Sequence, residues 1–283
     1  MYQVKTLNKI SPVGLAHLTE SYILTDKTED ADAILVRSQD MHEMEFSEKL
    51  EAIARAGAGV NNIPLDRCAK AGIVVFNTPG ANANAVKELV LCGMLLASRN
   101  VPAALTWAKG LTEDVSKTVE KGKSQFAGHE ILGKTLGIVG LGAIGRKVAE
   151  AAKALGMNIV GYDPYYVSGG EGLTVYPELA EMLPLCDIVT LHLPANDATK
   201  GMVNKEFLAS MKDGAILLNF SRDKLVNDVD LLVALESGKL TQYSRLPERQ
   251  SDRKRTYHTA AASGRFHRGG GGQLRDNGRH GTA

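Results

Sequence analysis

Short apolar runs alternate with longer stretches of helical period along most of the chain. The clearest candidate strands are six runs in which nearly every side chain is apolar, at residues 33–36, 73–76, 135–139, 158–161, 187–191 and 214–218. Runs of this kind are typical of parallel strands buried on both faces, and not of half-exposed antiparallel strands. The alternation therefore predicts an α/β protein built on parallel sheets.

A helical stretch separates the second run from the third. Residues 84–110 repeat apolar side chains at helical spacing, which predicts one long helix that crosses between two domains. Pro102 is its only proline and predicts a kink or a break there. Residues 111–123 are polar and charged without a sharp period, and we expect them to wrap loosely over the surface.

The chain has 283 residues, of which 44% are hydrophobic and 23% charged. This length predicts two domains, and the composition excludes a disordered or coiled-coil chain. Cys68, Cys92 and Cys186 have the spacing of neither a metal site nor a disulfide framework, so we expect reduced thiols and no metal. With no charged leader and no apolar window as long as a membrane span, a soluble cytoplasmic protein without a membrane partner is expected.

The formal net charge of +1 combines two unlike parts. Residues 1–243 carry 24 basic and 29 acidic side chains, whereas residues 244–283 carry nine basic and three acidic ones. The mildly acidic body argues against a nucleic-acid partner. The tail contains no Val, Ile or Met, so we expect no buried strand in it. A nucleic-acid arm is the least favoured reading of the tail, because it shows no binding fold.

Three glycines follow the third apolar run in the spacing G-x-G-x-x-G, at Gly140, Gly142 and Gly145. A helical stretch comes directly after them, which is the context that a dinucleotide-binding fingerprint requires. Gly140 allows a tight strand-to-helix turn, Gly142 lets the backbone approach a pyrophosphate, and Gly145 allows close packing of helix on strand. The pyrophosphate would then accept hydrogen bonds from the backbone of Ala143 and Ile144 at the helix N-terminus.

Asp163 ends the next predicted strand, eighteen residues beyond Gly145. A carboxylate there accepts hydrogen bonds from the ribose hydroxyls of a dinucleotide and repels a 2′-phosphate, so NAD is favoured over NADP as the cofactor. The alternative for Asp163-Pro164 is an ordinary turn, which the fingerprint makes the less favoured interpretation.

Five ordered motifs resemble the D-isomer-specific 2-hydroxyacid dehydrogenases. They are residues 55–63, residues 76–82 together with 87–89, the glycine fingerprint, residues 191–194 and residues 218–222. The similarity runs from the amino terminus to about Tyr243. It implies the amino-terminal part of a split, flavodoxin-like substrate domain at residues 1–92 and a Rossmann-type, doubly wound NAD domain at residues 93–243. The carboxyl-terminal completion is then missing, and residues 244–283 are an aberrant tail.

The resemblance also implies an activity. The family transfers hydride between NAD and a small D-2-hydroxy acid, and the motifs are most similar to members that oxidise 3-phosphoglycerate to 3-phosphohydroxypyruvate in serine biosynthesis. Glycerate, lactate or another 2-hydroxy acid is the nearest alternative substrate. Homodimers through the NAD domain are usual in the family, which makes the helix that carries Trp107 a candidate interface.

The resemblance assigns site residues one by one. In the family, the arginine that matches Arg222 binds the substrate carboxylate and polarises the reacting carbonyl, so Arg222 is the one catalytic residue assigned here. His192 receives no catalytic role. The substrate-binding residues are Arg55, Gly57, Ala58, Gly59 and Asn61. The cofactor-binding residues are Thr78, Gly140, Gly142, Ala143, Ile144, Gly145, Asp163, Leu193, Pro194, Phe220, Ser221 and Arg222.

Hydride transfer to or from a hydroxy acid needs a general acid–base group, which the family supplies as a histidine held by a glutamate. Neither motif follows Arg222, and His258, His267 and His280 lack the family's neighbours. We hypothesise a shift of reading frame near Tyr243, because an out-of-frame reading of the tail permits a string similar to the family's histidine loop. Two hypotheses stay open: an active dehydrogenase, and an NAD-binding chain without turnover that exposes apolar surface.

Overall fold

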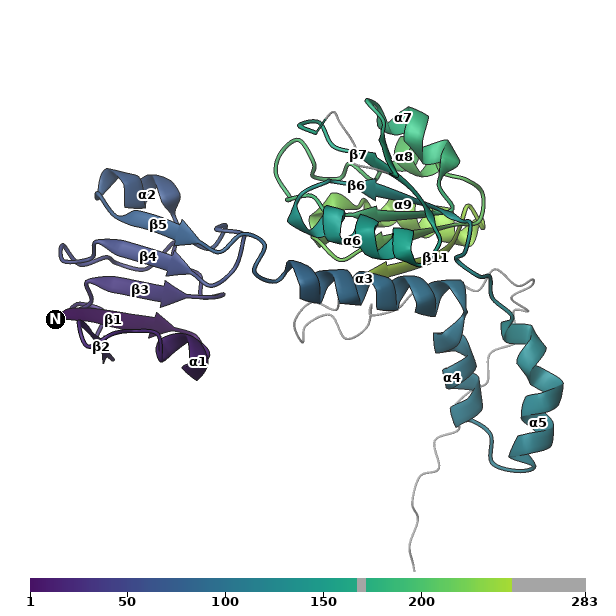
Figure 1. The fold of residues 1–283 in the computed structure, drawn as a ribbon, viewed down its shortest axis with the longest axis horizontal. Coiled ribbons are helices and arrows are strands. Elements are labelled where there is room, and N and C mark those ends of the chain that lie inside the picture. Colours follow the sequence, from purple (N-terminus) through teal and green to yellow (C-terminus); the bar gives the residue numbers. More distant parts are fainter. Residues whose placement is uncertain (167–171, 246–283) are drawn as a thin grey trace, which may run out of the picture.

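The computed structural model describes residues 1–166 and 172–245, which form two domains joined by a helix (Figure 1). The first domain is a five-stranded sheet in the order β2-β1-β3-β4-β5, with every neighbouring pair parallel. This is the flavodoxin-like order. Its strands and helices are β1 (Tyr2–Leu7), α1 (Pro12–Leu15), β2 (Tyr22–Thr25), β3 (Ala33–Val36), β4 (Ala52–Arg55), α2 (Leu65–Lys70) and β5 (Val74–Asn77).

The core of the first domain is small. Ile34 and Ile53, from central strands, are fully buried together with Cys68 of α2. The edge strands are open, because Leu24 on β2 is 55% exposed and Phe76 on β5 is 56% exposed. Both edges therefore present apolar side chains to solvent.

The second domain is a six-stranded sheet in the order β11-β10-β9-β6-β7-β8, again with every pair parallel. Counted along the chain this is the doubly wound order, in which the direction of winding reverses between β6 and β9. The two sheets confirm the predicted fold class. The strands are β6 (Thr135–Val139), β7 (Asn158–Tyr162), β8 (Leu173–Val175), β9 (Ile188–Leu191), β10 (Ala215–Asn219) and β11 (Leu240–Arg245).

Helices cover both faces of the second sheet (Figure 1). On one face, Val90 and Met94 of the joining helix pack with Val148 of the helix after β6. On the other face, Leu231 and Leu235 of the last helix belong to a buried apolar cluster. The helices of this domain are α6 (Ala143–Ala154), α7 (Leu179–Met182), α8 (Lys205–Ser210) and α9 (Asp228–Glu236), with short 3-10 turns η2 (Leu183–Leu185) and η3 (Asp223–Leu225).

The long helix expected at residues 84–110 is two helices. α3 (Ala83–Ser98) and α4 (Val101–Lys109) meet at an angle of 68°. The break lies at Asn100, whose φ of 52° is left-handed, a conformation that asparagine tolerates better than most residues. Pro102 then sits in the first turn of α4, where its missing N–H leaves no helical bond unmade.

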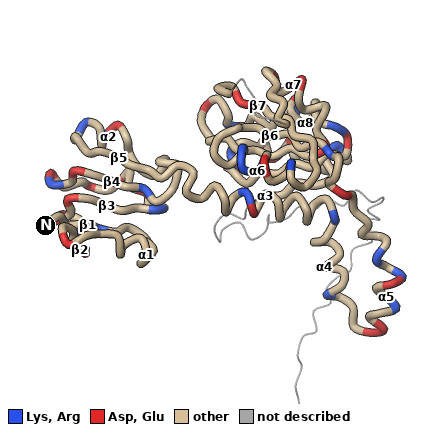
Figure 2. Tube along the Cα trace, in the orientation of Figure 1, with Lys and Arg blue, Asp and Glu red and all other residues tan. Residues whose placement is uncertain are grey.

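The segment expected to wrap loosely over the surface contains a helix, α5 (Val115–Gly122), followed by η1 (Lys123–Phe126). That expectation was wrong because the helix is short and amphipathic. Charged residues of both signs line α5 in Figure 2, and Val115 and Val119 fall on one side of the helix at (i, i+4) spacing.

All six runs predicted as strands are strands, to within one residue at either end. The strands without a predicted counterpart are β1, β2, β4, β8 and β11. The expectation that residues after Tyr243 form no buried strand was wrong for two of them. Ser244 and Arg245 pair with Leu218 and Asn219 of β10, and Ser244 is only 8% exposed. Interpretations that concern residues 246–283 lie outside the described residues.

Within residues 1–166 and 172–245, no single helix has both the length and the apolar composition to cross a membrane. The bent pair α3 and α4 meets that length and composition test only when the two helices are taken together.

Candidate functional site

The glycine-rich turn between β6 and α6 has the conformation that the sequence predicts. Gly140 has a φ of 98°, and a methyl group on it would lie 2.7 Å from the carbonyl oxygen of His192. A methyl group on Gly145 would lie 2.0 Å from the carbonyl oxygen of Gly140, so only glycine lets the helix pack this closely. Around Gly142, by contrast, a methyl group would meet no atom within 4 Å.

The open space at Gly142 faces the N-terminus of α6, which begins at Ala143. Free backbone N–H groups and the helix dipole make such an N-terminus a site for an anionic group. Asp163 lies directly beside it, because its Oδ2 accepts a hydrogen bond of 2.8 Å from the backbone N–H of Leu141. Its Oδ1 accepts one of 2.9 Å from Tyr165, and each oxygen keeps a lone pair for a further donor.

The segment after β9 borders the same turn. Leu193 packs against the glycines, since its Cδ2 atom lies 2.9 Å from the methyl position of Gly140, and Pro194 is exposed next to it. His192 has Nε2 at 3.1 Å from Oγ1 of Thr190. Burial lowers the pKa of His192 to about 4, so its imidazole is neutral near pH 7.

Arg222 leaves the carboxyl end of β10 and is held by its neighbours. Nδ2 of the buried Asn219 donates a 2.8 Å hydrogen bond to the carbonyl oxygen of Arg222, and Oγ of Ser221 donates one of 2.6 Å to Leu191. Phe220 fills the space next to Gly93 of α3. The guanidinium of Arg222 then reaches across to the first domain, where its Nη2 lies 3.2 Å from the methyl position of Gly59.

The loop after β4 forms the opposite side of the site. A methyl group on Gly57, whose φ is 153°, would overlap the guanidinium of Arg55. Ala58 accepts a 2.7 Å hydrogen bond from Nδ2 of Asn77, and Oδ1 of Asn61 lies 3.3 Å from the methyl position of Gly59. This loop thus folds around the Arg55 side chain and turns toward Arg222.

A second contact joins the domains one strand further along. Thr78 follows β5, and its N–H donates a 3.0 Å hydrogen bond to the carbonyl oxygen of Gly57. Two residues later, the methyl position of Gly80 lies 3.5 Å from Cβ of Ala143, at the start of α6. All predicted site residues therefore gather at the carboxyl ends of strands, on two edges that face each other, which is where such sheets bind ligands.

Arg37 is a further candidate site residue, which the sequence analysis missed. It follows β3, and its neighbour Val36 is in register with Arg55 of β4. Burial lowers the pKa of Arg55, and the nearby positive charges of Arg222 and Arg37 lower it further. The strand-end position that drew attention to Arg222 applies equally to Arg37, so the signal was present in the sequence.

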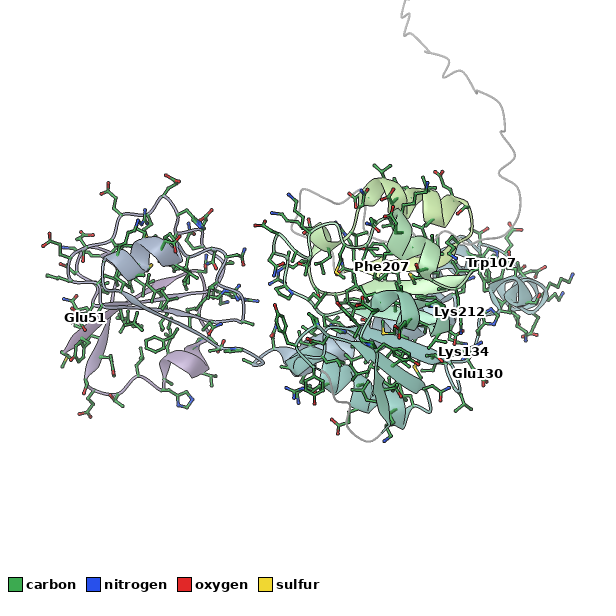
Figure 3. The ribbon with its side chains drawn as sticks, turned by 90° about the horizontal axis from the view of Figure 1, so that it is seen from above. Glu51, Trp107, Glu130, Lys134, Phe207 and Lys212 are labelled. Atoms are coloured by element: carbon green, nitrogen blue, oxygen red, sulfur yellow. The ribbon has the colours of Figure 1, made fainter. Side chains whose placement is uncertain are left out.

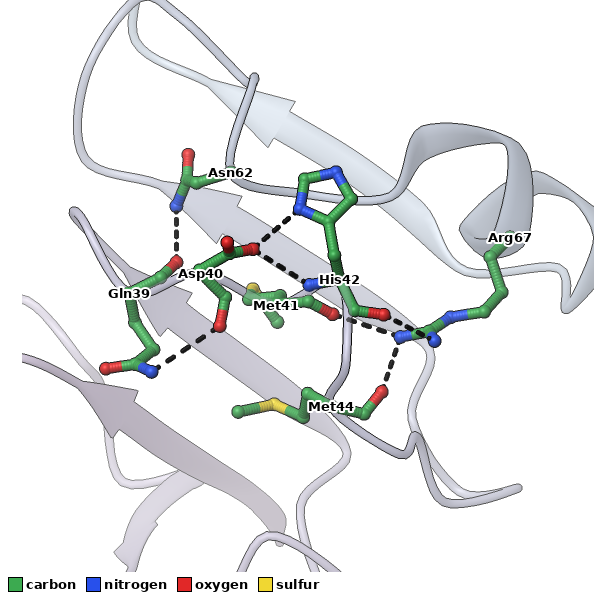
Figure 4. A network of polar contacts seen from close by, with 7 residues as sticks. All are labelled: Gln39, Asp40, Met41, His42, Met44, Asn62 and Arg67. Carbon is green, nitrogen blue, oxygen red and sulfur yellow. Dashed lines mark hydrogen bonds and ion pairs between the residues drawn. The ribbon is translucent and has the colours of Figure 1, made fainter.

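A polar network occupies the loop after Arg37 (Figure 4). The guanidinium of Arg67 donates hydrogen bonds to the carbonyl oxygens of Met41, His42 and Met44. In the part of the chain that the structure describes, the one ion pair between a histidine and a carboxylate joins His42 and Asp40 in this network, with Nδ1 and Oδ1 at 2.6 Å. No cluster of His, Cys, Asp or Glu side chains suited to a metal ion occurs among the described residues.

This arrangement matches a known family. The D-isomer specific 2-hydroxyacid dehydrogenase NAD binding domain matches residues 91–244, more than half of the chain. The chain belongs to the D-isomer-specific 2-hydroxyacid dehydrogenases. The matched part is the NAD-binding domain of this family, so NAD is the cofactor of the chain. Its residues fit NAD, because the space at Gly142 and the N–H groups of α6 suit a pyrophosphate and the carboxylate of Asp163 suits a ribose.

Relatives of this dehydrogenase include the D-3-phosphoglycerate dehydrogenase of Methanocaldococcus jannaschii, which is 38% identical over 245 residues, covering 84% of this chain and 45% of the relative. The chain thus spans less than half the length of the curated relatives it matches. The TT0316 protein of Thermus thermophilus is 27% identical, with a TM-score of 0.73 over 88% of this chain and 85% of that one. The apo D-mandelate dehydrogenase of Rhodotorula graminis, 24% identical, has the same fold, with a TM-score of 0.74 over 90% and 84% of the two chains.

Proposed function

We propose that this dehydrogenase oxidises 3-phosphoglycerate to 3-phosphohydroxypyruvate with NAD, in the cytoplasm and as part of serine biosynthesis. The observation that carries the substrate assignment is the placement of three arginines. Arg37 follows β3, Arg55 ends the neighbouring strand β4, and Nη2 of Arg222 lies 3.2 Å from the methyl position of Gly59 in the loop after β4, so the charges of Arg222 and Arg37 lower the pKa of Arg55. Positive charges gathered at one place repel one another, and an anion bound among them offsets that repulsion.

Three arginines suit the two anionic groups on this substrate, a carboxylate and a phosphate. One bidentate guanidinium satisfies a carboxylate, and Arg222 takes that role. Arg55 and Arg37 then remain for the phosphate, whose oxygens accept several charge-assisted hydrogen bonds. Lactate and glycerate carry only the carboxylate and would leave two guanidinium groups without an anionic partner.

Each side of the site has its own task in the reaction. NAD, when bound, accepts a hydride from the carbon that carries the hydroxyl group. Arg222 fixes the carboxylate beside that carbon and stabilises the negative charge that develops on the oxygen. The backbone of residues 57–61 and Thr78 close the site from the first domain, which orients the acid toward the glycine-rich turn.

The second candidate function is an NAD-binding chain without turnover. Oxidation requires a base for the hydroxyl proton. His192 has one nitrogen at Thr190 and the other buried, and His42 is paired with Asp40 on the surface of the first domain. Neither histidine has the family's glutamate as a partner, and the residues after Arg222 lack that motif.

One experiment separates the two candidates. NADH binding is followed by the rise of nucleotide fluorescence, and NADH formation is followed on addition of 3-phosphoglycerate. Binding together with a 3-phosphoglycerate-dependent rate supports the dehydrogenase function. Binding without a rate supports the second candidate, and the absence of NADH binding contradicts both.

We also propose that the chain forms a homodimer through the projecting pair of helices α4 and α5 (Figure 1). The two helices are joined by an aromatic contact, since the ring centroids of Trp107 of α4 and Phe126 of η1 lie 5.2 Å apart. It nevertheless leaves Leu105 55% and Val115 49% exposed, which suits a surface that packs against another subunit. Sedimentation of the full chain as a monomer at micromolar concentration would contradict this proposal.

A further inference from the structure

A cavity of about 490 Å³ lies in the second domain, at the end of the sheet opposite to the candidate active site. Its floor is formed where β6, β9, β10 and β11 begin, and its rim is formed by the end of α3 and by the segment before β6. Glu130, Lys134 and Lys212 lie along this side of the domain in Figure 3. The volume falls in the range of small-molecule sites.

Three side chains in this cavity have a buried polar atom without a hydrogen-bond partner. They are Oγ of Ser98, Oδ1 of Asn100 and Oε1 of Gln242. Ser98 and Gln242 are each only 7% exposed. Two of the three atoms are amide oxygens, which only accept, so each needs an N–H or O–H donor. A buried polar atom without a partner is unfavourable, and several of them at one cavity indicate that a ligand supplies the missing bonds.

The two lysines at the cavity differ, because only one of them forms an ion pair among the described residues. Nζ of Lys212 lies 3.0 Å from Oδ1 of Asp187, and Oδ2 of Asp187 accepts a hydrogen bond from the backbone of Thr135. Lys134 lies close enough to help lower the pKa of Asp187, but no ion pair joins it to another residue among 1–166 and 172–245. Two further carboxylates line the cavity: Asp213, which pairs with Nζ of Lys239 at 2.7 Å, and Glu130. Lys134 offers a positive charge to a ligand, while Lys212 is neutralised by Asp187.

The rim of the cavity is fixed. The N–H of His129 donates a 2.8 Å hydrogen bond to the carbonyl oxygen of Ser98, and a methyl group on Gly128 would lie 2.2 Å from the same oxygen. Gln125, on the rim, donates a 2.9 Å hydrogen bond to Gly122, against which the ring of Trp107 packs. The site is therefore preformed. Trp107 lies just outside it, because its ring packs against Gly122, the hydrogen-bond partner of Gln125.

We propose that this cavity binds a small hydroxylated anion, with its carboxylate or phosphate group at Lys134 and its hydroxyl groups donating to Asn100 and Gln242. Both features are required. The anionic group supplies the negative charge that pairs with Lys134, and the hydroxyl groups supply hydrogen-bond donors for the amide oxygens. The site is separate from the NAD site, since it lies at the amino ends of the strands and contains none of the residues assigned there.

Calorimetric titration of the full chain tests this site with simple probes. Glycerol 2-phosphate and D-glycerate carry both features, whereas inorganic phosphate carries no alkyl hydroxyl group and glycerol carries no charge. Saturable binding of either hydroxylated anion, with weaker binding of phosphate and of glycerol, is the expected result. A difference between the first two probes tells whether the anionic group is a phosphate or a carboxylate. A second readout is the fluorescence of Trp107, the single tryptophan of the chain.

Variants separate this site from the active site. Lys134→Met and Gln242→Met should each weaken the binding of the probe by about tenfold, the effect of one lost hydrogen bond to a charged or buried group. Lys205→Met removes a lysine outside the cavity and should leave binding unchanged. Arg222→Met should leave the binding of glycerol 2-phosphate unchanged, because this probe has no carboxylate for Arg222. Loss of binding in Arg222→Met with retention in Gln242→Met would place the probe in the active site and overturn the proposal. The absence of binding at millimolar probe would also overturn it, because the cavity then holds only water.

Discussion

Nη2 of Arg222 lies 3.2 Å from the position that a methyl group would take on Gly59, although the two residues belong to different domains. This approach brings the end of β10 and the loop after β4 to one site. At this distance an added methyl group forces the guanidinium to move by a few tenths of an ångström.

Gly59→Ala should therefore weaken the binding of 3-phosphoglycerate by about tenfold, as expected when one charge-assisted hydrogen bond loses its geometry. NADH binding should stay unchanged, because the change lies away from the glycine-rich turn. Gly14→Ala is the matched control, since a methyl group there meets nothing within 4 Å. Equal affinities of both variants and the wild type for 3-phosphoglycerate would show that Gly59 and Arg222 do not share a site.

Substitutions of two glycines of the fingerprint should differ in their effect on stability. A methyl group on Gly145 meets the backbone oxygen of Gly140 at 2.0 Å, so Gly145→Ala should lower the free energy of unfolding by about 2 kcal/mol and also weaken NADH binding. Gly142→Ala should leave stability within about 0.5 kcal/mol, yet weaken NADH binding, because its methyl group enters the space for the pyrophosphate. Chemical denaturation and NADH titration of both variants check this, and equal losses of stability would contradict it.

His192 should make the stability of the second domain depend on pH. Its pKa falls to about 4 in the folded state from an ordinary value of 6.5, because burial disfavours the charged ring. As the pH drops from 6.5 toward 4, the unfolded chain binds the proton and the folded chain does not, so stability falls. His192→Gln should remove on the order of 2 kcal/mol of this dependence. Denaturant midpoints measured at pH 7 and at pH 4.5 check it, and parallel curves for wild type and variant would contradict it.

The sequence predicted the second domain better than the first, and the reason is burial. The strands of the second sheet, such as Ile188–Leu191, are buried on both faces and read as continuous apolar runs. Strand β1 has a single buried residue, Val4, among polar neighbours, and β2 has none, so their sequences resemble loops. Strands that owe their place to tertiary pairing leave little local signal.

Some residues of the candidate site could be predicted from the sequence and others could not. Arg222 and the glycines stood out because each has a residue type that its position demands. Arg37 carries the same strand-end signal, but its proximity to Arg55 on the next strand follows only from the order of strands, which is a property of the fold. The sequence predicted the helix break at Pro102, whereas the structure has it at Asn100. The position was missed because proline fits the first turn of a helix as well as it breaks one.

The frame-shift hypothesis for the residues after Tyr243 predicts a definite nucleotide sequence. Moving the reading frame by one base near the codon for Tyr243 should restore a continuous dehydrogenase sequence with a glutamate and a histidine motif after Arg222. Sequencing the coding region is the measurement. Stop codons in both alternative frames within the next forty codons would contradict the hypothesis.

Equilibrium binding of 3-phosphoglycerate and D-glycerate to the NADH-loaded chain tests the central claim, that three arginines form a site for an acid with two anionic groups. The wild type should bind 3-phosphoglycerate about a hundredfold more tightly than D-glycerate, as two charge-assisted contacts imply. Arg37→Met, which replaces an exposed arginine, should reduce that preference about tenfold. Lys70→Met, at the far end of the first domain, should preserve it. Equal binding of the two acids by the wild type would contradict the account.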